Sequence, residues 1–398
     1  MNIIDLTKQY KEKILNLNDL KSYEKSYPSL FSHYFKYWAQ RKYFSKKLSW
    51  QGVLKRKKII LKSLDKIEKI LTKNNFNIRN LKVILFVGQN TSNGHSFFDN
   101  NEFVVWLPIE GYETKLQADV FILHEIIHAL HYKNCPDFYF NNISEKRSIS
   151  RQIITEGIAT YLSMKLLKTN DDTALWADYI SKNKTKKWNN ECEKRTLELY
   201  KFVLKNYNSS NKKIGLFYAS NSDDILNYRA GYYIGLNLIE NVVENLKIKD
   251  IEILKLPRKK LEIIIKQELI QKTKIPEIIN VGFHVDEPKL WAINNIPVEE
   301  ISISEIDYNL DIPYLEQEGT DDWNLTPRML INNFEKEKPH AKKVEQADIK
   351  YPIELYLFKN KWIILDGVHR FTKAVKLGYK TIKVRKISHE IAELTKRR

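Results

Sequence analysis

The chain has 398 residues, of which 43% are hydrophobic and 12% aromatic, and its formal net charge is +17. A chain of this length usually forms two or three domains, and its apolar content excludes wholesale disorder. The positive charge leaves nucleic acid open as a partner, although basic residues spread along the whole chain favour a solvated lysine-rich surface.

The two cysteines, Cys135 and Cys192, are too few for a disulfide framework, so nothing indicates an oxidising compartment. The first residues carry scattered charges and lack the apolar segment of a secretory signal. No apolar run reaches the ~18 residues that a membrane span needs. We therefore expect a cytoplasmic protein with no membrane partner.

The first half of the chain is predicted to be mostly helical with two strands. Residues 1 to about 75 show apolar positions at helical spacing among lysines. Strands are predicted at 81–88 and 102–108, because both segments are apolar and β-branched, and a turn-rich loop is expected between them. Helices are predicted at 116–132, where apolar residues cover most sides, and at about 148–168.

The pattern changes after further helices, which continue to about residue 272 and include 228–246. Pro276 and an irregular stretch indicate a boundary between about 275 and 295. An α/β pattern follows, with predicted strands at 298–304, 352–358, 361–366 and 381–387 and helices at 326–334 and 368–377.

The strongest motif lies inside the predicted helix 116–132, where His124, Glu125 and His128 spell HExxH. Residues i and i+4 share one helix face, so both imidazoles can bind one ion. Glu125 lies about 100° around the helix and can accept a proton from a water molecule that the metal polarises. Burying these polar side chains among Ile, Leu and Ala is costly without a partner, which favours a zinc site over a pair of core histidines.

The third protein ligand is a choice among three residues. His131 shares the face of the motif histidines but lies one turn further along. Glu145 falls in a predicted loop, whereas Glu156 falls in the next predicted helix beside Gly157. A small residue there lets two helices approach closely, and a carboxylate among apolar neighbours needs a role. We therefore predict Glu156 as the third ligand, with Glu145 as the alternative.

If the polarised water attacks a carbonyl group, a hydrogen-bond donor is also needed for the oxyanion that develops during the reaction. Tyr232 and Tyr233, in the predicted helix 228–246, and Tyr161 are candidates, and we select Tyr232 as the candidate catalytic tyrosine. His95, in the predicted loop, is a candidate for the wall of the cleft.

The run HEIIHALHY followed by TEGIATYLS resembles the gluzincin class of metallopeptidases, in which HExxH is completed by a Glu on a following helix. Residues 81–246 as a whole are similar to a poorly characterised family of predicted zinc-dependent proteases. This resemblance implies that His124, His128 and Glu156 bind Zn²⁺, that Glu125 is the general base and that the substrate is a peptide or protein. The Asp that follows the Glu ligand in thermolysin-like enzymes is absent, so we expect different outer contacts around the metal ligands.

A second motif lies near the C-terminus, where a predicted strand runs into Asp366 and Gly367 and a helix then opens. A helix N-terminus beside an arginine is suited to phosphate. Residues 296–388 resemble the ParB/sulfiredoxin-like fold, whose G-x-H-R element binds nucleotide phosphates. The resemblance implies that Gly367, His369 and Arg370 hold the phosphates of CTP or ATP; a turn with a structural role alone is the alternative.

The sequence thus predicts an α+β protein with three regions. These are an N-terminal helical region (1–75), a mostly helical zincin-type metallopeptidase domain with a small sheet (76–285) and a small α/β ParB/sulfiredoxin-like domain (286–398). The predicted function is a zinc-dependent peptidase with a nucleotide-binding domain. The alternative is a nucleotide- or DNA-binding ParB-like protein, or a small-molecule kinase, whose peptidase-like domain is a scaffold. The presence of Glu125 favours the enzyme.

Overall fold

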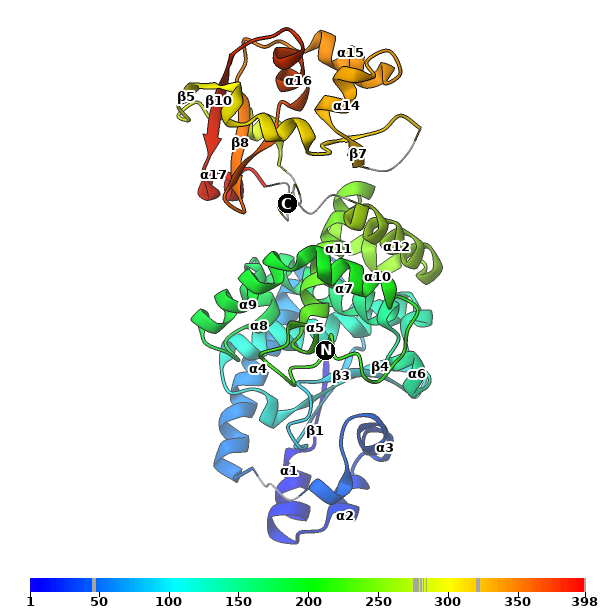
Figure 1. The fold of residues 1–398 in the computed structure, drawn as a ribbon. Helices are drawn as coiled ribbons and strands as arrows, with labels where there is room; N and C mark the ends of the chain where they lie inside the picture. The colour runs from blue at the N-terminus through cyan, green and yellow to red at the C-terminus, as the bar shows by residue number, and fades with distance from the viewer. Residues whose placement is uncertain are drawn as a thin grey trace. The chain divides into compact units, whose positions relative to one another are not determined.

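The computed structural model describes residues 1–44, 48–274, 279, 281, 283, 285–319 and 323–396. The fold is α+β, and the chain forms two compact units (Figure 1). The first comprises Met1–Arg195 and Phe202–Leu269, and the second comprises Thr196–Lys201 and Ile270–Arg398. Pro276, at the predicted boundary, lies outside the described residues. The predicted limits of the three regions stay predictions.

A four-stranded sheet lies within the first unit, in the order β1 (Asn2–Asp5), β2 (Lys82–Phe86), β4 (Glu102–Pro108) and β3 (His95–Asp99). β1, β2 and β4 are parallel to one another, and β3 is an edge strand antiparallel to β4. The strands predicted at 81–88 and 102–108 are confirmed. Two predictions were wrong: the N-terminal region is not all helical, because it begins with β1, and the segment before β4 is not only a loop, because it contains β3. β1 and β3 are short and are stabilised by pairing with β2 and β4, which their own residue patterns do not indicate.

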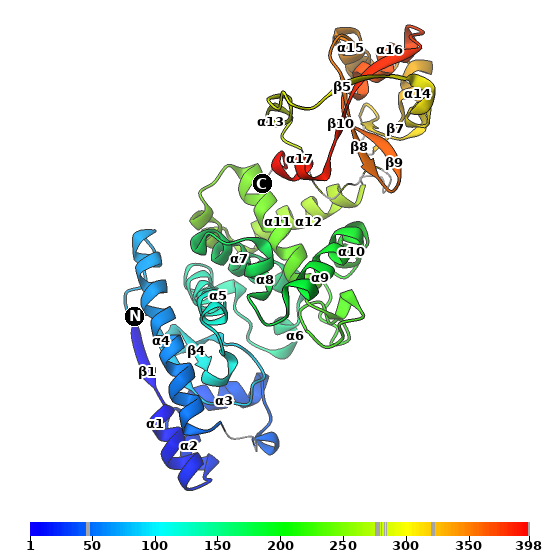
Figure 2. The same cartoon turned by 90° about the vertical axis from the view of Figure 1, so that its left-hand side faces the viewer.

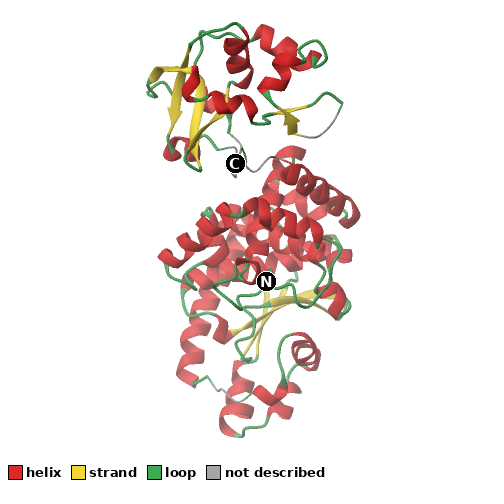
Figure 3. Ribbon diagram, viewed as in Figure 1, coloured by secondary structure: helices red, strands yellow, loops and turns green. Residues whose placement is uncertain are grey.

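Helices cover both faces of this sheet, as the colouring in Figure 3 shows. The N-terminal helices are α1 (Thr7–Gln9), the π-helical η1 (Tyr10–Asn16), α2 (Leu20–Glu24), α3 (Pro28–Tyr37) and α4 (Trp50–Lys73). The long helix α4 packs against α5 (Lys115–Asn134) (Figure 2). The α5 residue Asp119 accepts hydrogen bonds from Ser63 (2.6 Å) and Lys66 (2.6 Å), both on α4.

The central helix α5 confirms the helix predicted at 116–132 and its burial. Thr114 and Gln117 form a capping box at its start, which satisfies two backbone N–H groups that a helix end leaves unpaired. Every residue from Gln117 to Tyr132 is buried, so the whole HExxH segment lies in the interior. The two other predicted helices are also confirmed, as α7 (Ile149–Leu167) and α11 (Ala230–Leu246).

Two glycines bring α7 and α11 into direct backbone contact. A Cβ atom added to Gly157 would lie 2.5 Å from the carbonyl oxygen of Gly235, and one added to Gly235 would lie 2.7 Å from the carbonyl oxygen of Ile153. Only glycine fits at such a crossing. The close approach predicted from Gly157 is therefore confirmed, with α11 as the partner helix.

The remaining helices of this part are α6 (Ile143–Lys146), α8 (Asp171–Trp176), α9 (Lys182–Lys194), α10 (Thr196–Lys205) and α12 (Arg258–Lys274). Single 3₁₀ turns are η2 (Arg41–Tyr43), η3 (Ile109–Gly111), η4 (Pro136–Phe138), η5 (Ile225–Asn227), η6 (Asp250–Lys255), η7 (Ile303–Glu305) and η8 (Asp307–Asp311). None of the helices in the described ranges is both long and apolar enough to cross a lipid bilayer.

The second unit is a small α/β arrangement around the sheet β5 (Val298–Ser302), β10 (Thr381–Ile387), β8 (Ile353–Phe358) and β9 (Lys361–Asp366), in that order. A two-stranded sheet pairs β6 (Leu315–Glu316) with β7 (Trp323–Leu325). The helices are α13 (Glu287–Trp291), α14 (Pro327–Asn332), α15 (Lys338–Gln346), α16 (Val368–Lys376) and α17 (His389–Leu394). The strands and helices predicted after residue 296 are thus confirmed.

Candidate metal centre

Three side chains from two helices converge at one point inside the first unit. Nε2 of His124 lies 3.0 Å from Oε2 of Glu156 and 3.1 Å from Nε2 of His128, and the His128–Glu156 separation is 3.4 Å. Helix α5 supplies both histidines and α7 supplies the glutamate. Both histidine side chains are buried, whereas Glu156 is 20% exposed and gives the site access to solvent.

This donor set fits a zinc ion. Ligand atoms at about 2.0–2.1 Å from a tetrahedral ion lie about 3.3 Å from one another, which is close to the three separations observed here. Two imidazoles and one carboxylate are also the donor types of catalytic zinc sites, which leave the fourth position to water or substrate. Within the described ranges, His124, His128 and Glu156 are the one group of three such donors.

The charges of the three groups support one another. Burial alone would raise the pKa of Glu156, but His128 and His124 hold that pKa well below its usual value, so the carboxylate is ionised. Burial tends to lower the pKa of His128, and the adjacent Glu156 carboxylate reverses this and raises it. Burial lowers the pKa of His124 to about 4, so this imidazole is neutral, as a metal ligand requires.

Glu125 lies next to the three donors without belonging to them. Burial, reinforced by the charge of Glu156, raises the pKa of its carboxyl from 4.5 to about 8, although His128 opposes the shift. The turn before β3 packs on this side chain, because a Cβ atom on Gly94 would lie 2.8 Å from Cγ of Glu125. Glu125 is thus a buried carboxyl whose pKa suits proton transfer near neutral pH.

The three tyrosine candidates occupy different places. The Tyr232 ring lies 6.2 Å from the His124 ring, and burial and the charge of Glu156 raise the pKa of its hydroxyl. The Tyr161 hydroxyl instead donates to Asp250 (2.7 Å), and the Tyr233 ring contacts Trp188 (6.2 Å). Of the three, Tyr232 is the one whose ring contacts a predicted ligand.

The other candidates lie outside the three-donor group. Glu145 accepts a hydrogen bond from the backbone N–H of Asn141 (2.8 Å) in the chain between α5 and α7. His131 is fully buried against Phe138, with ring centroids 4.5 Å apart and neither ring nitrogen hydrogen-bonded in the described part of the chain. His128 also lacks a partner at Nδ1 there, so its outer contacts differ from the carboxylate contact that a zinc-bound histidine usually makes.

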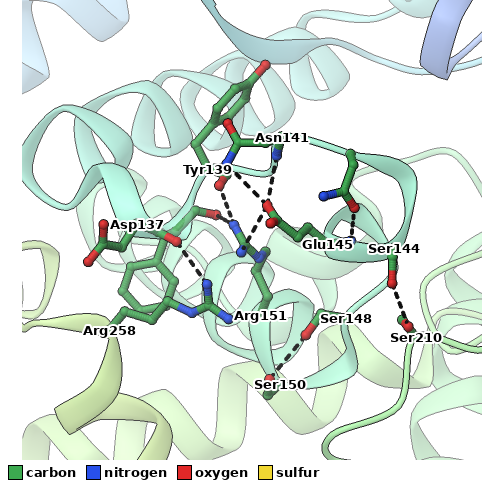
Figure 4. A network of polar contacts seen from close by, with 12 residues as sticks. Asp137, Tyr139, Asn141, Ser144, Glu145, Ser148, Ser150, Arg151, Ser210 and Arg258 are labelled. Carbon is green, nitrogen blue, oxygen red and sulfur yellow. Dashed lines mark hydrogen bonds and ion pairs between the residues drawn. The ribbon is translucent and has the colours of Figure 1, made fainter.

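Arg151, which the sequence analysis did not single out, organises the segment between the two ligand helices (Figure 4). Its guanidinium donates to the carbonyl oxygens of Phe138 (2.7 Å) and Tyr139 and pairs with Glu145 (3.6 Å). Arg258 adds a second tie, to the carbonyl oxygen of Asp137 (3.1 Å). An arginine inside an otherwise apolar helix was the signal available in the sequence, since a buried guanidinium needs several acceptors.

Comparison with known proteins agrees with this chemistry. Residues 57–263, just over half of the chain, match the family described as Predicted Zn-dependent protease (DUF2268). The matched segment contains the three donors, Glu125 and Tyr232. No curated protein matches the sequence, and no solved structure matches the fold.

Zinc binding is expected to depend on all three donors. His124→Ala, His128→Ala and Glu156→Gln should each lose most of the metal found in the wild-type protein, about one zinc per chain by elemental analysis. His131→Leu is the matched control, because His131 lies on the same helix outside the donor group, and it should keep the metal. Full zinc retention in the first three variants would contradict this assignment.

In the metal-free protein, the contribution of Glu125 to the stability should fall as the pH rises. The pKa of Glu125 is about 8 in the folded protein and 4.5 for an ordinary glutamate, as in the unfolded chain. Between pH 4.5 and 8, the folded protein therefore holds a proton on Glu125 that the unfolded chain has lost. The stability that the protonated carboxyl provides is therefore present below pH 4.5 and is lost as the pH approaches 8, at most about 1.4 kcal/mol per pH unit. Glu125→Gln should remove this contribution, so in urea denaturation the stability of the variant relative to the wild type should rise from pH 5 to 8. Parallel curves for the two proteins would contradict the expectation.

Proposed function

The chain belongs to the family of predicted Zn-dependent proteases, and from this we propose that it is a zinc-dependent peptidase with Glu125 as its general base. The observation that carries the proposal is the convergence of His124, His128 and Glu156 within 4.8 Å, with Glu125 beside them. A peptide or protein is the substrate class that this chemistry requires. The cytoplasmic location stays a prediction.

The roles of the residues follow from their positions. His124, His128 and Glu156 would hold the zinc, which when bound lowers the pKa of water and polarises a carbonyl group. Glu125 accepts the proton of the attacking water and later returns it to the leaving amine. The Tyr232 hydroxyl keeps its proton at neutral pH, because its pKa is raised, and can donate a hydrogen bond to the oxyanion that develops on the substrate.

Glu125→Gln should keep the zinc and lose peptide hydrolysis. The amide cannot accept a proton, whereas the three metal donors are unchanged, so kcat should fall by about 10²- to 10⁴-fold. Glu113→Gln is the matched control, because the Glu113 side chain is 66% exposed. Among the described residues, its ion-pair partner is Arg56, which lies outside the metal donors. Hydrolysis of casein-derived peptides, with zinc content measured on the same samples, is the test. A Glu125→Gln variant with wild-type activity would show that another group is the base.

A second candidate function concerns the second unit, where we propose a phosphate site at Gly367, His369 and Arg370. A hollow of about 320 Å³ is lined by these residues together with Tyr351 and Asp366. Gly367 has a left-handed backbone (φ +96°) and precedes α16, whose first N–H groups can donate to an anion. Arg370 already pairs with Asp366 (2.9 Å), so a phosphate must compete with this carboxylate for the guanidinium.

Arg370→Ala should weaken nucleotide binding by the full-length protein about 10- to 100-fold, as expected for loss of a hydrogen bond to a charged group. Arg328→Ala is the matched control, since Arg328 also pairs with an aspartate (Asp311, 2.6 Å) but lies outside the hollow. Calorimetry with CTP, ATP and GTP is the measurement. If the wild-type protein binds none of the three, this turn has only a structural role. Salt-dependent binding of duplex DNA instead would favour the scaffold alternative.

A further inference from the structure

Four aromatic side chains that carry ring nitrogens meet beside the edge strand β3. They are His33 from α3, Trp38 at the end of α3, His95 from β3 and Trp106 from β4, and we call them the ring-nitrogen cluster. His33 and His95 stack, with centroids 5.5 Å apart and planes 6° apart. Trp38 contacts His95 at 4.9 Å and Trp106 at 5.9 Å, and Trp106 contacts His95 at 6.0 Å. The four rings thus form one contiguous group.

One nitrogen of each ring is buried without a hydrogen-bond partner among the described residues: Nε2 of His33 and His95, and Nε1 of Trp38 and Trp106. Buried polar atoms in native proteins are nearly always paired, and each unpaired one costs about 1–3 kcal/mol. Four such atoms in one group indicate a partner outside the described residues. Burial, with help from Lys146 and Lys36, lowers the pKa of His33 to about 3, so its imidazole is neutral.

A lysine without a counter-ion completes the group. Nζ of Lys146 lies 3.5 Å from the centre of the Trp38 ring and donates to the carbonyl oxygen of Tyr37 (2.9 Å). No carboxylate among the described residues forms an ion pair with Lys146, and burial lowers the pKa of its ammonium to about 8. An anion at this position would both neutralise the lysine and accept the unused N–H groups.

The cluster adjoins the candidate metal centre. Gly94, next to His95 in the chain, packs on Glu125, the proposed general base. The charges of His128 and Glu156 act on His95, and that of Glu156 acts on Lys146. An anion held here would therefore lie within electrostatic range of the candidate metal centre.

We propose that Lys146 and the ring-nitrogen cluster form a carboxylate-binding subsite that selects peptides with an acidic group near the scissile bond. That the bound carboxylate belongs to a substrate rests on the proposed peptidase function, whereas the subsite itself rests on the geometry of the cluster. The indole nitrogens only donate, each neutral imidazole can donate from one nitrogen, and the ammonium has three donors. A carboxylate, with two oxygens that accept several such bonds, matches this set in charge and in hydrogen-bonding type.

The carboxylate can come from two sources, a free peptide C-terminus or an Asp or Glu side chain. Two pairs of short peptides separate them. In the first pair, a peptide with neutral side chains ends in a free carboxylate or in an amide. In the second pair, both ends are blocked and an internal Glu is replaced by Gln.

Binding to the full-length, zinc-free protein is measured first, by calorimetry. In at least one pair the acid should bind about 10- to 100-fold more tightly than its neutral twin. Lys146→Met should remove this preference, because it deletes the charge and keeps the aliphatic stem. Lys42→Met is the matched control, since Lys42 is exposed and also lies over a neighbouring aromatic ring, that of Tyr43 (4.7 Å), and it should keep the preference. Equal binding of acid and neutral twins by the wild-type protein, or an unchanged preference in Lys146→Met, would overturn the subsite.

Trp38→Phe provides a second variant that preserves the ring packing and removes one indole N–H. It should weaken binding of the preferred acid and leave binding of its neutral twin within about twofold; equal loss for both twins would count against the subsite.

Hydrolysis by the zinc-loaded protein is then measured for all four peptides. An acid preference in binding without any hydrolysis would refute the peptidase and keep the subsite, whereas hydrolysis without acid preference would refute the subsite alone.

Discussion

The ionised carboxylate of Glu156, held between His124 and His128, is the interaction on which the first unit depends. A buried carboxylate is costly unless it is paired, and here the two imidazoles lower its pKa well below the usual value. This pairing requires α5 and α7 to lie at one fixed separation. The backbone contact between Gly157 and Gly235 braces α7 from its other side, so α11 and Tyr232 are positioned by the same constraint.

Hydrogen bonds from two arginines hold the segment that joins the two ligand helices. Arg151, on α7, is buried, and its guanidinium donates hydrogen bonds to the carbonyl oxygens of Phe138 and Tyr139. The same segment continues through Phe140, which stacks on His95, to Lys146. One buried guanidinium thus links the geometry of the metal donors to that of the proposed carboxylate subsite.

The charges around the centre follow a simple arrangement. Glu156 supplies negative charge at the point where a divalent cation would bind, while Lys146 lies within electrostatic range of it without a carboxylate ion-pair partner in the described part of the chain. A divalent cation and an anionic substrate group would complement these two charges separately. In the second unit, Arg385 pairs with the buried Glu354 (2.6 Å) and donates to the carbonyl oxygens of Ile293 and Leu290, so this buried guanidinium is satisfied within the unit.

Local sequence determined the helices that carry the site and the residues that meet there. The apolar stripe of α5 and the i, i+4 spacing of His124 and His128 are set by helical periodicity, and Glu156 was identifiable as a carboxylate in an apolar helix beside Gly157. Strands β2 and β4, and β8 in the second unit, were identifiable because each is a mostly apolar run.

Tertiary structure alone decided the features that depend on contacts between distant segments. β1 and β3 are strands because β2 and β4 offer them hydrogen-bonding edges, and neither short segment has a pattern that predicts this. The ring-nitrogen cluster unites residues of α3 and β3 with Lys146, and a lone His or Trp in the sequence does not reveal whether its nitrogen will find a partner. Periodicity within one segment is a local property, whereas burial and hydrogen-bond satisfaction depend on which segments the chain brings together.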